Sequence, residues 1–203
     1  MSIGADKWGP ERLALAVHLR DDVLPDDWVV FMENGTLLGS FRDGKQIPHD
    51  DDFDLAVVID DPAEVGAMMA TLSGRLRHPY KVRRVDTYAD KFEVYDPHSG
   101  NYPLLGPGYG NADFHCVTVD LQLYLRQGTC LRCLYYREPN GDRTEGETYP
   151  LSVVLPPTTS PIDGEEFPAP AQVERFLVSR YGCLDRDAVL DRSTGKYLPS
   201  PTQ

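Results

Sequence analysis

The sequence predicts an α+β (mixed α/β) fold, in which a small mixed sheet carries helices packed on one side. Two observations support this class: helical and strand-like segments alternate in the first half of the chain, and strand-like segments then follow one another directly before a last helix. The 203 residues suffice for one domain with a sizeable core. We therefore expect a single domain over 1–203, with its core at about 10–183 and a C-terminal tail at about 184–203.

Three helices are expected, because apolar residues recur in these segments at helical spacing. The first begins near Pro10 and ends before Pro25. The second covers 61–78, where acidic residues and a proline occupy the first turn. The third lies within 170–182 and ends at Gly182, a residue type that commonly follows a helix.

Strands are expected where apolar residues run together or alternate with polar ones between turn signals. In chain order, these strands are 27–34, 53–60, 80–86, 91–96 and 114–125. Gly35 turns the chain from the first strand into a short helical turn that ends at Gly44. Residues 87–91 would connect two strands as a hairpin. The Gly- and Pro-rich loop at 102–113 precedes the last strand, so we expect it to border the functional site and to tighten over a substrate.

The charge of the chain excludes one broad class of partner. The formal net charge is −12, which argues against a protein that binds a nucleic-acid backbone by counterion release. No apolar run approaches the roughly 20 residues that cross a bilayer, and the N-terminus lacks the order of a secretory signal. We therefore expect no nucleic-acid partner, no membrane segment and a cytoplasmic location.

The run HDDDFDLAVVID, residues 49–60, joins several aspartates to an apolar strand. Because strand residues two apart share a face, Asp52 and Asp54 are expected to project together. The opposite face is then the core face, and it carries Phe53, Leu55, Val57 and Ile59. Two adjacent carboxylates repel one another unless a cation lies between them, and such paired oxygens suit Mg²⁺ or Mn²⁺.

A third acid, Asp120 in VDLQLY, lies in an otherwise apolar strand, where it is costly unless it faces a site. If its strand neighbours the one that follows Asp52, Asp120 completes a cluster of three carboxylates with Asp52 and Asp54. An acidic run is also typical of a solvated loop or a helix N-cap. Gly35 and Gly39 likewise fit either a plain turn or a close approach of the backbone to a phosphate.

The segment GTLLGSFRDGKQIPHDDDFD, residues 35–54, closely resembles the signature of the LicD/fukutin family. Its members share a nucleotidyltransferase-like fold and carry a Gly-Thr-x-Leu-Gly turn, an arginine and an Ile-Pro-Trp-Asp-x-Asp-x-Asp run. VDLQLY resembles the family's later strand acid, and FPAPAQVERFLVSRYG resembles its C-terminal Leu-x-x-x-Tyr-Gly helix. The resemblance thus spans about residues 10–183. One departure is His49, which stands where the family usually has tryptophan.

The resemblance implies a metal-dependent phosphotransferase. It would move a phospho-alcohol from a nucleotide diphosphate donor, with CDP-linked donors the first candidates, to a hydroxyl of a glycan or glycoconjugate, forming a phosphodiester. Asp52, Asp54 and Asp120 are then the catalytic and metal-binding residues, with Mg²⁺ or Mn²⁺ as cofactor. Asp120 acts as general base or as third metal ligand. Two alternatives stay open: a nucleotidyltransferase that moves a nucleoside monophosphate, and a non-catalytic binding module of the same fold.

Further residues are expected to bind substrate: Gly35, Thr36, Gly39, Ser40, Arg42, His49 and Asp50. Gly35, Thr36 and Ser40 would bind phosphate oxygens through backbone N–H and hydroxyl donors. Arg42 follows the turn and would meet a phosphate, or else form a surface ion pair with nearby acids. Asp50 would orient a metal ligand or have only a loop role.

The four cysteines predict no complete metal site. Cys130 and Cys133 form a C-x-x-C pair, but Cys116 and Cys183 are distant, and no second close pair completes a zinc signature. Some members of the resembled family carry a zinc-binding insertion, so structural Zn²⁺ is an alternative to the expected reduced thiols.

Overall fold

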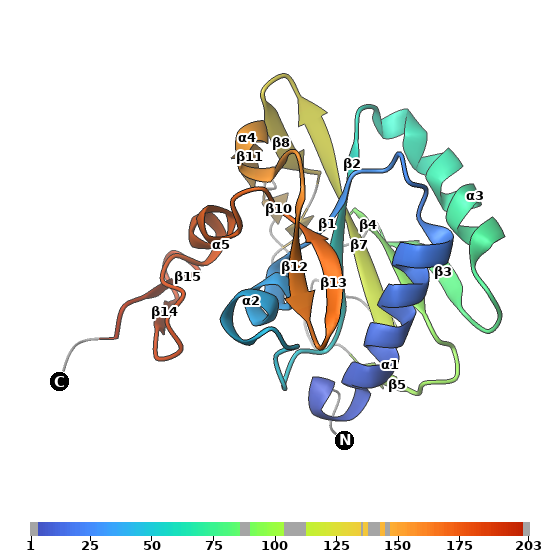
Figure 1. The fold of residues 1–203 in the computed structure, drawn as a ribbon, viewed down its shortest axis with the longest axis horizontal. Coiled ribbons are helices and arrows are strands. Elements are labelled where there is room, and N and C mark those ends of the chain that lie inside the picture. The colour runs from blue at the N-terminus through green and yellow to red at the C-terminus, as the bar shows by residue number, and fades with distance from the viewer. Residues whose placement is uncertain are drawn as a thin grey trace.

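The computed structural model describes residues 4–85, 90–103, 113–134, 136–137, 143–144 and 147–200. Within them, a seven-stranded mixed sheet forms the centre of the molecule (Figure 1). Five strands follow the order β1-β2-β7-β4-β3, while β8 pairs with β7, and β11 with β8. The strands are β1 Val30–Met32, β2 Phe53–Ile59, β3 Lys81–Val85, β4 Lys91–Tyr95, β7 Thr118–Gln127, β8 Cys130–Cys133 and β11 Thr148–Pro150.

The register of the central strands aligns acidic residues. β2 and β7 are parallel, and Asp54 lies opposite Asp120. β4 runs antiparallel to β7 on the other side, where Glu93 lies opposite Asp120. Side chains at paired positions of a sheet point to the same face, so three strands present carboxylates together.

The predicted helices are present and differ in extent, and one short helix, α4, was not predicted. They are α1 Ala5–His18 with the π-helical turn Leu19–Val23, α2 Asn34–Asp43, the 3₁₀ turn Pro62–Glu64 with α3 Val65–Arg75, α4 Leu151–Val154, and α5 Val173–Tyr181. α1 begins before Pro10, which lies inside the helix rather than near its start. α2 ends at Gly44, as predicted. No helix of the described residues is long and apolar enough to cross a membrane.

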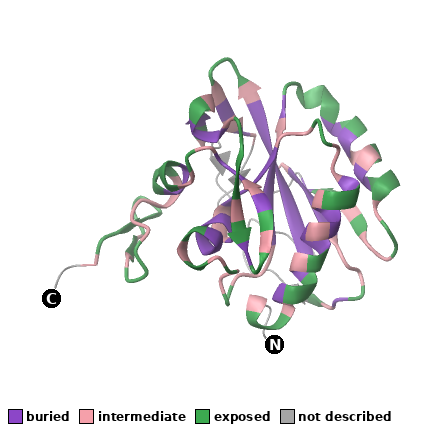
Figure 2. Ribbon diagram, viewed as in Figure 1, coloured by how far each residue is buried: buried purple, intermediate pink, exposed green. Residues whose placement is uncertain are grey.

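The α+β class is confirmed, and helices cover both faces of the sheet rather than one (Figure 1). On the face that carries Asp54, the ring of Phe31 lies 5.6 Å from Tyr124 and 5.8 Å from Phe176 of α5. On the opposite face, α1 contacts β2 and β7, and the ring of Phe53 lies 5.1 Å from that of Phe167 in the segment Glu165–Ala169. The central strands are therefore buried on both sides (Figure 2), and the predicted faces agree with the register: Asp54 and Asp120 share one face, and Phe53 and Leu55 lie on the other.

Several strands were not predicted. They include β8 and β11, β5 Asn101–Pro103, which pairs with β6 Asp113–His115, the pair β9 Tyr136–Arg137 and β10 Arg143–Thr144, and the hairpin β12 Thr158–Ile162 and β13 Glu165–Ala169. The strand expected over 114–125 is divided, because β6 ends at His115 and β7 begins at Thr118. The connection expected at 87–91 falls largely, and the loop at 102–113 mostly, outside the described residues.

The chain ends in a hairpin where the sequence predicts only a tail. Its strands are β14 Val189–Asp191 and β15 Lys196–Leu198, and they lie beside α5 (Figure 1). Most residues of this hairpin are exposed (Figure 2).

Candidate active site

Three aspartates, from the parallel strands β2 and β7 and from the position just before β2, meet at one point. Ligand oxygens of Asp52, Asp54 and Asp120 lie within 4.8 Å of one another. Asp54 and Asp120 are buried, and Asp52, just before β2, is partly buried. Oxygens of Asp50 and Asp51 form a second such group with Asp52. We call these five residues the acidic cluster.

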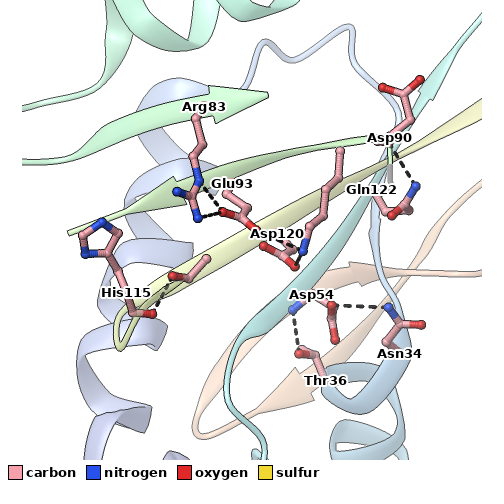
Figure 3. A network of polar contacts seen from close by, with 11 residues as sticks. Asn34, Thr36, Asp54, Arg83, Asp90, Glu93, His115, Asp120 and Gln122 are labelled. Atoms are coloured by element: carbon pink, nitrogen blue, oxygen red, sulfur yellow. Dashed lines mark hydrogen bonds and ion pairs between the residues drawn. The ribbon is translucent and has the colours of Figure 1, made fainter. Parts of the chain in front are cut away.

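The first turn of α2 supports Asp54 (Figure 3). The backbone N–H of Asp54 donates to Thr36 Oγ1 at 2.8 Å, and Asn34 Nδ2 donates to Asp54 Oδ1 at 3.3 Å. Asn34 has a φ of 48°, a conformation that asparagine tolerates better than most residues. The turn after β1 therefore fixes both the backbone and the carboxylate of Asp54.

A chain of alternating charges supports Asp120 from β3 and β4 (Figure 3). Lys91 Nζ contacts Asp120 Oδ2 and lies 3.3 Å from Glu93 Oε1. Arg83 Nε donates to Glu93 Oε2 at 2.6 Å. Sequence reasoning missed Lys91 and Glu93. The sequence does place these two charged residues on one face of a strand, because they are two positions apart. Only the order of strands in the sheet shows that this face meets Asp120.

Burial makes the charged forms of the cluster unfavourable without a cation. It raises the pKa of Asp54 well above its ordinary value, and the neighbouring charge of Asp50 adds to the effect. It likewise raises the pKa of Asp52, which Asp54 raises further. Burial raises the pKa of Asp120 to about 6, although the Lys91 ammonium opposes the shift.

The donor set fits a hard divalent cation. Asp120 Oδ1 is buried and has no hydrogen-bond partner among the described residues. Carboxylate oxygens are the ligands that Mg²⁺ and Mn²⁺ prefer, and Mg²⁺ completes its shell with water and substrate phosphates. Asp52, Asp54 and Asp120 are the residues that could hold such an ion.

The acidic cluster lines a cavity of about 600 Å³, a size typical of small-ligand sites. Part of its wall comes from the start of α2 and the segment before β2, through Gly35, His49 and Asp50. Another part comes from the end of the chain, through Arg180, Tyr181, Arg186 and Tyr197. Sequence reasoning missed these last four residues, because nothing in their local pattern places them beside the aspartates.

The predicted substrate-binding residues separate into two groups. Gly35, His49, Asp50 and Arg42 line the cavity. Thr36, Gly39 and Ser40 are buried and have structural partners instead. Thr36 supports Asp54 and Gly39 packs against the Lys45 carbonyl, while the Ser40 hydroxyl lies 2.7 Å from Ser160 Oγ and donates to the Pro161 carbonyl at 2.8 Å. The Ser40 hydroxyl thus joins α2 to β12.

Arg42 has a different set of partners from those expected. Its Nε donates to the Leu184 carbonyl at 2.9 Å, and its Nη2 donates to the Asp185 carbonyl at 3.1 Å. These bonds are to the backbone of the C-terminal segment, rather than the surface ion pair that was the alternative prediction.

The cysteines contribute to no metal group among the described residues, where both groups of suitable side chains consist of aspartates. None of the four cysteines, all of which lie among the described residues, forms a disulfide. Cys130 and Cys133 lie on β8, where residues three apart point to opposite faces. This arrangement does not favour the zinc alternative.

Comparison with known proteins agrees with this geometry. A family model described as LicD/FKTN/FKRP, nucleotidyltransferase domain, matches residues 28–172, which include β1, α2, β2 and β7. The search of curated proteins gave no match.

Proposed function

Because the chain belongs to the LicD/FKTN/FKRP nucleotidyltransferase-domain family, whose members are transferases, we propose that it is a metal-dependent phosphotransferase. It moves a phospho-alcohol, such as phosphocholine, an alditol phosphate or a sugar phosphate, from a nucleotide diphosphate donor to a glycan hydroxyl. The observation that carries this proposal is the convergence of Asp52, Asp54 and Asp120 in one cavity.

In this proposal the three aspartates hold Mg²⁺ or Mn²⁺, which when bound neutralises charge on the diphosphate and on the leaving group. Gly35, His49 and Asp50 line the same cavity, and we assign them to the donor's side of the site. A side chain at Gly35 would overlap the Asp50 carboxylate, so glycine lets Asp50 approach the first turn of α2. Asp50 thereby stays next to Asp52, where it helps to orient the metal-binding acids.

The transfer needs one proton acceptor. The acceptor hydroxyl oxygen forms a bond to the phosphorus of the phospho-alcohol, and the bond from that phosphorus to the nucleoside monophosphate breaks. The nucleoside monophosphate leaves with the electron pair, and the hydroxyl proton passes to a carboxylate. Asp120 is our candidate for this base, because a pKa of about 6 leaves it mostly ionised at neutral pH. Its alternative role is that of third metal ligand.

The same cavity suits a second reaction, nucleotidyl transfer, which the name of the matched family domain favours. Here the acceptor attacks the phosphorus attached to the nucleoside, and the phospho-alcohol leaves. The two reactions use the same substrates and differ in the phosphorus that is attacked, so their products separate them.

Donor screening tests the proposal. The protein is heated with CDP-, GDP- and UDP-linked alcohols and sugars, with and without Mg²⁺, since a ligand of the folded state raises the apparent stability. We expect stabilisation by one nucleotide class, only with Mg²⁺. Mass spectrometry with a glycan acceptor should then detect nucleoside monophosphate and a phosphodiester product. A nucleotide attached to the acceptor would indicate nucleotidyl transfer, and Mg²⁺-dependent binding without turnover would indicate a binding module.

A further inference from the structure

The matched family domain ends at residue 172, yet part of the cavity wall is formed by residues of 180–197. We infer that residues 183–198, here called the C-terminal arm, are a functional part of the site and bind the nucleoside diphosphate portion of the donor, and that Arg42 is the positioning residue that holds the arm there. The identity of the ligand rests on the proposed function. The placement of the arm does not.

The arm has its own ordered structure. β14 and β15 pair with each other, and between them the Asp191 carboxylate accepts hydrogen bonds from Ser193 and Thr194. Such side-chain contacts are typical of a defined turn. The arm therefore presents its residues in a fixed arrangement rather than as a loose tail.

The arm is joined closely to the end of α5. The Cys183 N–H donates to the Tyr197 carbonyl at 2.8 Å, and Lys196 Nζ donates to the Ser179 carbonyl at 2.7 Å. Gly182 has a φ of 79°, and a side chain there would meet the Tyr197 carbonyl, so glycine suits both the turn and this close approach. These contacts bring β15 back against the helix that carries Arg180 and Tyr181 on the cavity wall.

The last turn of α2 also contacts the arm, at residues 184–186. Arg42 donates two hydrogen bonds to the carbonyls of Leu184 and Asp185, and Arg186 forms an ion pair with Asp43. The first turn of the same helix supports Asp54. A ten-residue helix is about 15 Å long, so α2 links the acidic cluster to the arm over a distance that suits a nucleoside diphosphate.

The chemistry of the arm complements the acidic cluster. The cluster binds an anion only through a cation, whereas the arm side of the cavity carries the guanidinium groups of Arg180 and Arg186. The Arg186 side chain is 72% exposed, and guanidinium groups match phosphate oxygens in geometry and charge. Tyr197 is 37% exposed, and its ring lies 6.4 Å from that of Tyr181, so it offers a face to a nucleobase.

The substitution Arg42→Lys tests whether Arg42 holds the arm in place, because it keeps the positive charge at position 42. Lysine has no planar fork and does not reproduce two bonds to adjacent carbonyls. Arg75→Lys is the matched control, because Arg75 also lies in the last turn of a helix and donates to a carbonyl, that of Val23, but is not part of the cavity wall. Three quantities are measured: trypsin cleavage after Arg186 and Arg192, binding of CDP, UDP and GDP with Mg²⁺ by calorimetry, and binding of Mn²⁺ alone.

We expect Arg42→Lys to be cut faster in the arm and to bind the preferred nucleotide at least ~10-fold more weakly, about 1.4 kcal/mol, with unchanged Mn²⁺ affinity. In turnover, KM for the donor should rise more than kcat falls. Arg186→Gln should weaken nucleotide binding while speeding cleavage after Arg192 less than Arg42→Lys does, because both hydrogen bonds from Arg42 to the arm remain. Faster cleavage with normal nucleotide binding would overturn the role of the arm in the site, and unchanged cleavage would overturn the role of Arg42. If the parent protein binds none of the three nucleotides, the proposed function fails, and with it the ligand named here.

Discussion

Asp54 and Asp120 lie directly opposite one another in the register of the parallel strands β2 and β7. Parallel strands require a crossover between them, and here it contains α3, β3 and β4. The site therefore depends on the whole topology, since neither aspartate has its partner until the crossover is complete. The same crossover brings β4, with Lys91 and Glu93, to the other side of Asp120.

Lys91→Met should change stability and metal affinity in opposite directions. Without the ammonium, Asp120 and Glu93 lose a buried counter-charge, so the metal-free protein should lose stability, by about 3 kcal/mol in urea unfolding. Because the ammonium no longer competes for Asp120 Oδ2, Mn²⁺ affinity should rise. Lys81→Met, an exposed residue of the neighbouring strand β3, is the control and should change neither quantity appreciably. Weaker Mn²⁺ binding by Lys91→Met would show that Lys91 supports the ion rather than competing with it.

Gly35→Ala should reduce activity with little effect on folding. The new Cβ would overlap the Asp50 carboxylate, which must then move away from Asp52. We expect turnover to fall at least ~10-fold, about 1.4 kcal/mol in transition-state stabilisation. Gly74→Ala in α3 is the control, because no atom lies within 4 Å of the position that its new Cβ would take, and it should gain about 0.5–1 kcal/mol of stability without loss of activity. Normal activity of Gly35→Ala would show that the reaction does not require Asp50 to lie close to residue 35.

The metal-free protein should lose stability as the pH rises. Burial raises the pKa of Glu33 to about 7, and those of Asp50 and Asp120 to about 6. An acid with a raised pKa in the folded state contributes stability that is complete below its ordinary pKa and is lost as the pH rises through the raised value. The free energy of unfolding in EDTA should therefore fall between about pH 4 and about pH 8.

The net charge of −12 also lowers stability as the pH rises, because the ionised acids repel one another. A substitution at Glu33 separates the contribution of a buried acid from this general repulsion. Glu33 is buried and accepts a hydrogen bond from Tyr124 at 2.6 Å. Glu33→Gln is neutral at every pH, so its stability should depend less on pH than that of the parent. Glu11→Gln, at an exposed position of α1, should leave the slope unchanged. Equal slopes for Glu33→Gln and the parent would contradict the assignment to Glu33.

The acidic site could be predicted because strand geometry is local. The period of two places Asp52 and Asp54 together, and an acid in an apolar strand pointed to Asp120. Lys91 and Glu93 could not be assigned, because their place beside Asp120 depends on the order of strands in the sheet. The hairpin of β12 and β13 was predictable in principle, since Asp163-Gly164 is a strong hairpin signal. The C-terminal arm was not, because its contacts come from residues far away in the sequence, such as Arg42.

The central claim is that Asp52, Asp54 and Asp120 form one metal site, and calorimetric titration of Asp54→Asn with Mn²⁺ tests it most directly. Asparagine keeps the shape and removes a charge, so metal affinity should fall at least ~10²-fold, about 2.7 kcal/mol. The fold should persist, and the metal-free variant should be at least as stable as the parent, because one member of a repelling buried group is gone. Asp60→Asn, an exposed residue at the end of β2, is the control and should bind Mn²⁺ like the parent. Asp54→Asn with the parent's Mn²⁺ affinity would contradict the account.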